Sequence, residues 1–150
     1  MIIIEDTRQQ AGKHKKKHDW WQNNGDTLIR CKLPFGDYAF PPAIAVDTKA
    51  NLTEIATNMC GSFTEQKRFK NECVRAREAG CMLVFLIECG LDAPKDLFGI
   101  NIMLGNGREI KGDQLAIAMS TMESRYGCKF EFAKPSKAAQ RINEILNGKE

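Results

Sequence analysis

The sequence predicts an α/β domain with a mixed central sheet flanked by helices, and three observations support this fold class. Residues 81–88 form an uninterrupted apolar run, which is typical of a central strand covered on both faces. Residues 38–49 contain two short strand-like segments around a Pro-Pro turn, which indicates an antiparallel hairpin. After this hairpin, amphipathic helical patterns alternate with apolar strands, as expected when helices cover a sheet.

The remaining elements follow from local patterns along the chain. Further strands are expected at residues 1–4, 27–33 and 128–132. Helices are expected at residues 18–23, 51–60, 63–79 and 112–126, and from residue 135 onward. Residues 89–111 contain Gly, Pro, Asp and Asn without a clear period, so we expect a long loop there.

The composition narrows the class of protein. A chain of 150 residues with 43% hydrophobic content is expected to form one domain, residues 1–150, with a proper core. The net charge of +3 is too small for a polycationic nucleic-acid coat, so DNA binding would have to come from local patches. Six cysteines without a Cys-x-x-Cys pair indicate free, mostly buried thiols.

The sequence also bears on location. It shows no signal-peptide pattern and no apolar run approaching about 18 residues, so we expect a soluble protein of a reducing compartment with no membrane partner. This corresponds to the cytoplasm, to the nucleoid, or to the host-cell cytoplasm if the protein is viral.

Acidic and basic side chains gather around the predicted hairpin. Asp37 precedes its first strand, and Asp47-Thr48-Lys49 ends its second. The two-residue period of a strand places Asp47 and Lys49 on one face, with Asp37 able to fold back toward them. Two carboxylates and an ammonium at one point suit metal-assisted phosphodiester cleavage, because the carboxylates hold a hard cation and the lysine offsets developing charge. The alternative is a set of solvated hairpin charges.

Several motifs occur in a characteristic order. They are Asp6-Thr7-Arg8-Gln9 after an apolar strand, Gly36-Asp37-Tyr38, Asp47-Thr48-Lys49, Gly61 to Gln66, an apolar strand ending in Glu88, and Pro135-Ser136 before an amphipathic helix. In this order and over nearly the whole chain, they resemble the nuclease domain of the XPF family of structure-specific DNA endonucleases, a branch of the restriction-endonuclease-like superfamily. The chain departs from the family pattern at Gln9, Asp47, Thr48, Thr53 and Ser62, where the family has Glu, Glu, Arg, an acid and Arg.

The resemblance implies a restriction-endonuclease-like fold and a Mg²⁺- or Mn²⁺-dependent endonuclease that cleaves branched or flapped DNA in repair or recombination. The implied catalytic residues are Asp6, Arg8, Asp37, Asp47 and Lys49, and the implied metal ligands are Asp6, Asp37, Asp47 and the backbone carbonyl of Thr48. Two alternatives are a catalytically inactive DNA-binding or scaffold subunit of a nuclease complex, and an RNA nuclease on the same fold.

A basic loop follows the first predicted strand and is expected to lie near Asp6. DNA contacts are expected from this loop and from the start of the helix at 63–79: Lys13, Lys15, Lys16, Lys17, Gln66 and Arg68. The alternative is a solvated lysine loop. Trp20 and Trp21 either stack on bases or pack in the core. His14 and His18 have the spacing of a metal pair, but the surrounding lysines disfavour a zinc ion.

The resemblance also bears on partners. XPF relatives usually carry a tandem helix-hairpin-helix module after the nuclease and work as dimers. The sequence ends at Glu150 without such a module, so a stand-alone form is expected. Recognition of branched DNA would then come from a homodimer, from a separate protein partner, or from residues 89–111.

Overall fold

A six-stranded mixed sheet forms the centre of the computed structural model, which describes residues 1–10, 12–40 and 44–148. The strands lie in the order β2 (Thr27–Arg30), β1 (Ile2–Glu5), β3 (Tyr38–Phe40), β4 (Ile44–Lys49), β5 (Met82–Glu88) and β8 (Lys129–Ala133). β3 is antiparallel to both of its neighbours, and the other adjacent pairs are parallel. The predicted mixed sheet is therefore confirmed, although the Pro-Pro turn lies outside the described residues.

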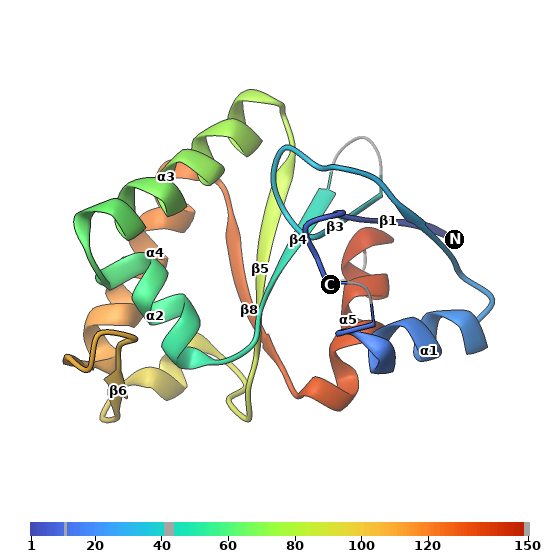
Figure 1. The fold of residues 1–150 in the computed structure, drawn as a ribbon. Helices are drawn as coiled ribbons and strands as arrows, with labels where there is room; N and C mark the ends of the chain where they lie inside the picture. Colours follow the sequence, from blue (N-terminus) through green and yellow to red (C-terminus); the bar gives the residue numbers. More distant parts are fainter. Residues whose placement is uncertain (11, 41–43, 149–150) are drawn as a thin grey trace.

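Different helices cover the two faces of this sheet (Figure 1). On one face lie α2 (Leu52–Cys60), α3 (Phe63–Glu78) and α4 (Gly112–Tyr126), and on the other lie α1 (Lys15–Asn23) and α5 (Ala138–Leu146). Along β5, Phe85 belongs to the core under the first face, whereas Val84 and Leu86 belong to the core under the second. This two-residue period buries β5 on both sides, as its apolar run predicts.

Two of the helices, α2 and α3, begin at capping residues. The Asn51 side chain accepts a hydrogen bond from the amide of Glu54 at the start of α2, and the Ser62 hydroxyl accepts one from the amide of Glu65 at the start of α3. A side-chain oxygen thus satisfies a backbone N–H that lacks an intrahelical partner. No helix in the described part of the chain has the length and apolar character needed to cross a membrane.

Helix α1 starts three residues earlier than predicted and is fixed by Trp21. The indole of Trp21 packs edge-on against the ring of Tyr38, with 5.0 Å between ring centroids. Its Nε1 also donates a hydrogen bond of 3.1 Å to the carbonyl oxygen of Ala139 in α5. Trp21 is therefore a core residue, the second of the two roles considered for it. This anchor holds the C-terminal part of α1 against the sheet and α5.

The predicted loop at residues 89–111 is wrong. The segment contains a short 3₁₀ helix, Pro94–Leu97, and a hairpin of β6 (Asn101–Met103) and β7 (Glu109–Lys111). Each of the two strands has only three residues and buries one of them, which is too short for a periodic pattern; the buried side chains of the segment are Leu97, Ile102, Leu104 and Ile110. Similarly, β2 ends at Arg30, three residues before the predicted end of that strand.

The six cysteines are all free, as predicted. Cys60, Cys73 and Cys128 are buried in the core under α2, α3 and α4, whereas Cys31 is exposed. The buried thiols contribute apolar contacts to this core.

Gly36 forms the tight entry to the hairpin. Its φ is +73°, in the left-handed region, and a Cβ at this position would lie 3.1 Å from the Cβ of Ala45 and 3.3 Å from the carbonyl oxygen of Val46. The turn brings Asp37 next to β4, because the Asp37 amide donates to the Val46 carbonyl oxygen at 2.8 Å. A side chain at residue 36 is therefore incompatible with this close approach.

We predict that Gly36→Ala lowers the free energy of unfolding by about 2 kcal/mol, because it combines a left-handed backbone with steric contact. The matched control is Gly90→Ala, because a Cβ there meets no atom within 4 Å and φ is not left-handed. That control is expected to change the free energy of unfolding by less than about 1 kcal/mol. Urea unfolding of the three proteins measures the difference, and equal stability of the two variants would contradict it.

Candidate active site

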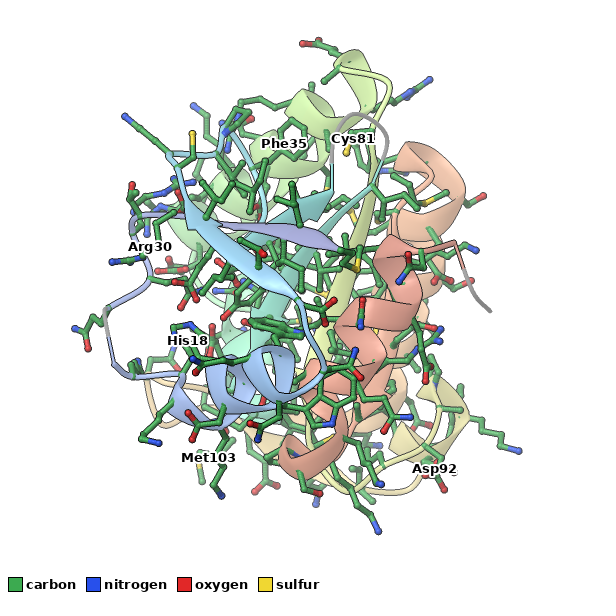
Figure 2. All side chains as sticks on the ribbon, turned by 90° about the vertical axis from the view of Figure 1, so that its right-hand side faces the viewer. His18, Arg30, Phe35, Cys81, Asp92 and Met103 are labelled. Carbon is green, nitrogen blue, oxygen red and sulfur yellow. The ribbon has the colours of Figure 1, made fainter. Side chains whose placement is uncertain are left out.

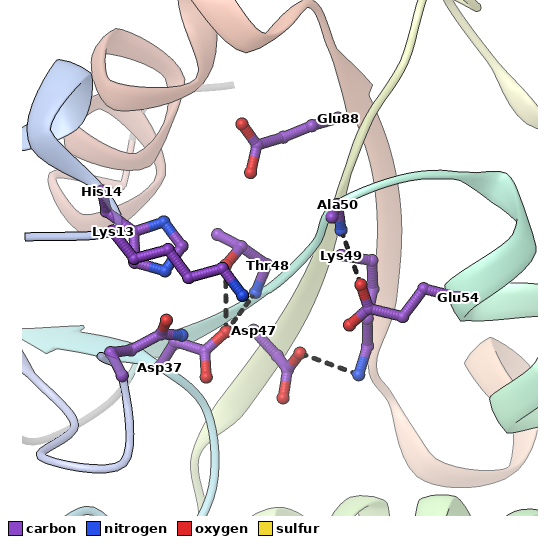
Figure 3. Close-up of a pocket in the computed structure, with 10 residues that line it drawn as sticks. Lys13, His14, Asp37, Asp47, Thr48, Lys49, Ala50, Glu54 and Glu88 are labelled. Atoms are coloured by element: carbon purple, nitrogen blue, oxygen red, sulfur yellow. Dashed lines mark hydrogen bonds and ion pairs between the residues drawn. The ribbon is translucent and has the colours of Figure 1, made fainter.

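The candidate site lies at the sheet edge where β1, β4 and β5 end. These three strands run in the same direction, because β3 is antiparallel to both β1 and β4, and β4 is parallel to β5. Open α/β sheets bind ligands at this edge. A pocket of about 190 Å³ opens here, and Figure 3 shows its lining residues: Gln9, Lys13, His14, Asp37, Asp47, Thr48, Lys49, Ala50, Glu54 and Glu88.

Asp37 is held in the pocket by hydrogen bonds to β4. Its Oδ2 accepts bonds from the Thr48 amide at 2.7 Å and from the Thr48 hydroxyl at 3.0 Å. Thr48, which stands where the family pattern has Arg, therefore fixes the orientation of this carboxylate. Burial raises the pKa of Asp37 to about 7, and the charge of Asp47 contributes to the increase.

Asp47 and Lys49 share one face of β4, as the strand period predicts. Asp47 Oδ1 lies 3.1 Å from Lys49 Nζ. Burial raises the pKa of Asp47 to about 8, although Lys49 opposes this effect. Burial alone would lower the pKa of Lys49, but the charges of Asp47 and Glu72 outweigh it, and the net shift is upward. Lys49 is thus a charged ammonium at neutral pH and is not available as a base.

Glu72 of α3 is a site residue that the sequence analysis missed. Its Oε2 accepts a hydrogen bond of 2.9 Å from the Gly36 amide, and its charge raises the pKa of Asp47. It faces a second pocket, on the α3 side of Lys49, together with Arg8, Asn58, Glu65, Arg68, Phe69 and Arg75. The sequence did contain a signal for this role. Glu72 lies on the same side of α3 as the apolar residues Phe69 and Cys73, where an acid with no structural role is not expected.

Asp6 and Arg8 bind each other beside the pocket. Asp6 Oδ2 accepts a hydrogen bond from Arg8 Nε at 2.5 Å, and Asp6 Oδ1 accepts one from the Leu33 amide at 3.0 Å. Arg8 also donates to the Leu33 carbonyl oxygen at 2.7 Å. Asp6 is joined to Asp37 only through the backbone, by a 2.6 Å hydrogen bond from its amide. Three of the four predicted groups, Asp37, Asp47 and Lys49, therefore line the pocket, whereas the Asp6 carboxylate binds Arg8 next to it.

The pocket can provide two carboxylates to a divalent cation, those of Asp37 and Asp47. Within the described residues, no group of three His, Cys, Asp or Glu side chains is placed to hold a metal ion. Asp37 and Asp47 remain as a buried pair whose charges are only partly balanced by Lys49. Mg²⁺ often binds through one or two carboxylates and keeps several waters. The pair therefore fits such an ion, provided that backbone oxygen and water complete its coordination.

The lysines of the loop and of α1 do not all point the same way. Lys13, Lys15 and Lys16 are exposed, and Figure 3 shows the Lys13 side chain extending into the pocket toward the two aspartates. Lys17, in contrast, is buried, and its Nζ lies 2.9 Å from Glu88 Oε2 and 3.1 Å from Oε1. The prediction that Lys17 contacts DNA needs correction, because its ammonium already pairs with a carboxylate out of solvent.

The two predicted contacts on α3 also separate. Arg68 is exposed and lines the second pocket next to Lys49. Gln66 donates a hydrogen bond of 2.9 Å to the Gly61 carbonyl oxygen and lines a groove between α3 and α4 instead. The structure thus brings Arg68, but not Gln66, toward the candidate site.

Comparisons with known proteins give a match to solved structures. No family model and no curated protein matches the sequence. A structure of XPF from Aeropyrum pernix superposes with a TM-score of 0.70 at 18% sequence identity, covering 98% of this chain and 64% of that one. A second structure of XPF from Aeropyrum pernix, in complex with DNA, superposes with a TM-score of 0.68 at 17% identity and covers 97% of this chain and 63% of that one.

The chain has the XPF nuclease fold. This confirms the predicted fold class, a mixed central sheet flanked by helices, and the chain spans slightly less than two thirds of the length of the XPF chains it matches.

We predict that Lys17→Met lowers the free energy of unfolding by about 3 kcal/mol, because it leaves the Glu88 carboxylate without its cation. The side chains of Lys17 and Glu88 are only 7% and 10% exposed. Adding Glu88→Gln to the same chain is expected to restore part of the loss. The exposed Lys16→Met serves as control, with a change within about 0.5 kcal/mol. Equal stability of the two single variants in urea unfolding would contradict a buried ion pair.

We predict that the metal-free protein becomes less stable as the pH rises from about 5.5 to 8.5. The folded state raises the pKa of Asp37 to about 7 and of Asp47 to about 8, so it retains protons that the unfolded chain has already lost, and this stabilisation disappears as the pH passes those values. Asp37→Asn, whose side-chain carbonyl can still accept from Thr48, should reduce the slope and exceed the wild type in stability at pH 8. Urea midpoints across this range test the sign. A wild type that gains stability with pH, and remains above the variant, would refute it.

Proposed function

We propose that this protein is a metal-dependent endonuclease that hydrolyses phosphodiester bonds in DNA at the pocket of Asp37, Asp47 and Lys49. The observation that carries the proposal is the pair of buried carboxylates beside a charged lysine, at the carboxyl edge of a sheet with the XPF nuclease fold. The XPF structure in complex with DNA supports DNA as the nucleic acid. Branched or flapped DNA is proposed as the preferred form, and RNA would be distinguished by substrate competition.

The residues of the pocket have distinct roles in the proposed reaction. Asp37, Asp47 and the carbonyl of Thr48 would hold Mg²⁺ or Mn²⁺, and Asp6, whose carboxylate already binds Arg8, would act through water. When bound, the cation supplies Lewis-acid activation of the phosphate and of water. The Thr48 amide and hydroxyl keep Asp37 oriented toward it. Lys49, held by Asp47, donates hydrogen bonds to the phosphate or the attacking water and offsets the charge that develops on the phosphoryl oxygens.

Basic side chains on both sides of the pocket support a path for the DNA backbone. Lys13, Lys15 and Lys16 are exposed at the α1 side, and Arg68 and Arg75 line the second pocket on the α3 side. Charged groups on either side of a cleavage site neutralise successive phosphates and fix the register of the strand without reading its sequence. A scissile phosphate over Asp37 and Asp47 would then have neighbouring phosphates on both flanks.

We predict that the wild type nicks fork, flap or Holliday-junction DNA with Mg²⁺ or Mn²⁺, and that Asp47→Asn and Lys49→Ala slow single-turnover cleavage by about 10²-fold or more. Each variant removes one charge from the pocket. Glu109→Gln, an exposed acid on β7, is the control and should cleave at the wild-type rate. Circular dichroism shows whether each variant is folded. Equal cleavage by the wild type, Asp47→Asn and Lys49→Ala would refute the proposal.

A catalytically inactive DNA-binding or scaffold subunit is the second candidate function. Two observations favour it: no three His, Cys, Asp or Glu side chains of the described residues are placed together to hold a metal ion, and Thr48 replaces an arginine of the family pattern. A partner nuclease would then contribute the chemistry. This candidate requires tight binding of junction DNA without cleavage under any divalent ion, so the same set of substrates separates the two.

A further inference from the structure

Two histidines stand one helical turn apart at the start of α1, and only one of them has a protein partner. His18 Nε2 lies 2.6 Å from Glu5 Oε2, and Figure 2 shows His18 on the face of the molecule formed by α1 and α5. His14 Nε2 is shielded from solvent and has no hydrogen-bond partner in the described part of the chain. Since these are the only histidines of the protein, the contrast between them is direct.

His14 lies in the wall of the candidate active site. It lines the pocket together with Asp37, Asp47 and Thr48, and Figure 3 shows its ring beside Thr48 and the side chain of Lys13. Apart from the exposed Lys13, the charged groups of this pocket have partners within the protein. Lys49 lies against Asp47, Asp37 accepts from Thr48, Glu88 accepts from Lys17, and Glu54 accepts from the Ala50 amide. His14 Nε2 is the exception.

A shielded polar atom without a partner costs free energy unless it meets a ligand or water. The ring is also suited to contact an anion without repelling a cation. Burial lowers the pKa of His14, and the neighbouring charge of Lys17 lowers it further, together with Lys13 and His18 and against the opposite effect of Glu5. The imidazole is therefore neutral at neutral pH, with one nitrogen able to donate a hydrogen bond.

We propose that His14 is a further substrate-contacting residue of this site, whose Nε2–H donates a hydrogen bond to a nonbridging oxygen of the scissile phosphate. This inference rests on the proposed function. It places the phosphate between two donors, with Lys49 at the end of β4 on one side and His14 at the start of α1 on the other. Helix α1, anchored by Trp21, would then have a direct part in the reaction.

A nuclear magnetic resonance titration tests the contact without cleavage. Asp47→Asn, labelled with ¹⁵N, is titrated with junction DNA in the absence of divalent ions, and Asp47→Asn with His14→Gln assigns the two imidazole signals. The ring signals of His14 are expected to shift on DNA binding. Those of His18, whose Nε2 is bound to Glu5, should move much less and form the internal control. Bound DNA with an unmoved His14 signal would overturn the inference.

Cleavage measurements test the role in the reaction. His14→Ala is expected to slow single-turnover cleavage by about 10²-fold, with a smaller loss for His14→Gln, whose amide can still donate. Gln22→Ala, on an exposed position of α1, should match the wild type. The contacted nonbridging oxygen can also be replaced by sulfur. This replacement should slow cleavage by the wild type by a larger factor than it slows cleavage by His14→Ala, because the variant no longer makes that hydrogen bond. A purely structural role of His14 would leave the two sulfur effects equal.

The outcomes distinguish this inference from the function on which it rests. A wild type that cleaves none of the substrates would overturn the proposed nuclease, and the inference with it. If the wild type cleaves and His14→Ala cleaves at the same rate, the role of His14 is overturned while the proposed nuclease stands. The same holds if sulfur slows both proteins by the same factor. Thermal unfolding of His14→Gln and His14→Ala ensures that the rates compare folded proteins.

Discussion

The burial of two carboxylates on one hairpin is the constraint on which the rest of the site depends. Asp37 and Asp47 lie at the same sheet edge, and among the described residues Lys49 is the one cation in an ion pair with either of them. Burial raises the pKa of both acids, which means that the folded chain resists holding both as anions. Such a site is stabilised by protonation or by a bound cation, so its electrostatic cost and its proposed chemistry have the same origin.

The surrounding fold maintains this arrangement from both faces of the sheet. From the α3 side, Glu72 binds the amide of Gly36 and so fixes the turn that leads to Asp37. From the α1 side, the pairing of Lys17 with Glu88 fastens the helix to the end of β5. The positions of the pocket walls are thus set by polar contacts between elements distant in sequence. Helix α1 carries Lys15 and Lys16 on its exposed side and the Lys17 anchor on its buried side.

Much of the fold could be predicted, because its elements have strong local signals. The apolar run of β5 and the capping residues Asn51 and Ser62 mark their elements without reference to the rest of the chain. The hairpin β6–β7 could not be predicted, because each of its strands buries a single residue, Ile102 or Ile110. Their burial depends on the core that they join and not on a pattern in the sequence around them. The spacing of apolar residues thus predicts a helix or strand where burial is periodic along the chain, and gives no prediction where it is not.

The site shows the same division. The common face of Asp47 and Lys49 follows from strand geometry alone, whereas the roles of Lys17 and Glu72 depend on partners far away in sequence. The run Lys15-Lys16-Lys17 gives no sign that one of these lysines is buried against the end of β5. The binding of Asp6 by Arg8 is likewise invisible in the motif, which only places the two side chains two residues apart.

The most direct measurement of the central claim is the anomalous scattering of a crystal soaked with Mn²⁺. If Asp37 and Asp47 jointly hold the cation, one strong peak will lie between their carboxylates, at about 2.1 to 2.2 Å from an oxygen of each, and it will disappear in Asp37→Asn. A pocket without a peak at saturating Mn²⁺, or a peak that persists unchanged in the variant, would contradict the account.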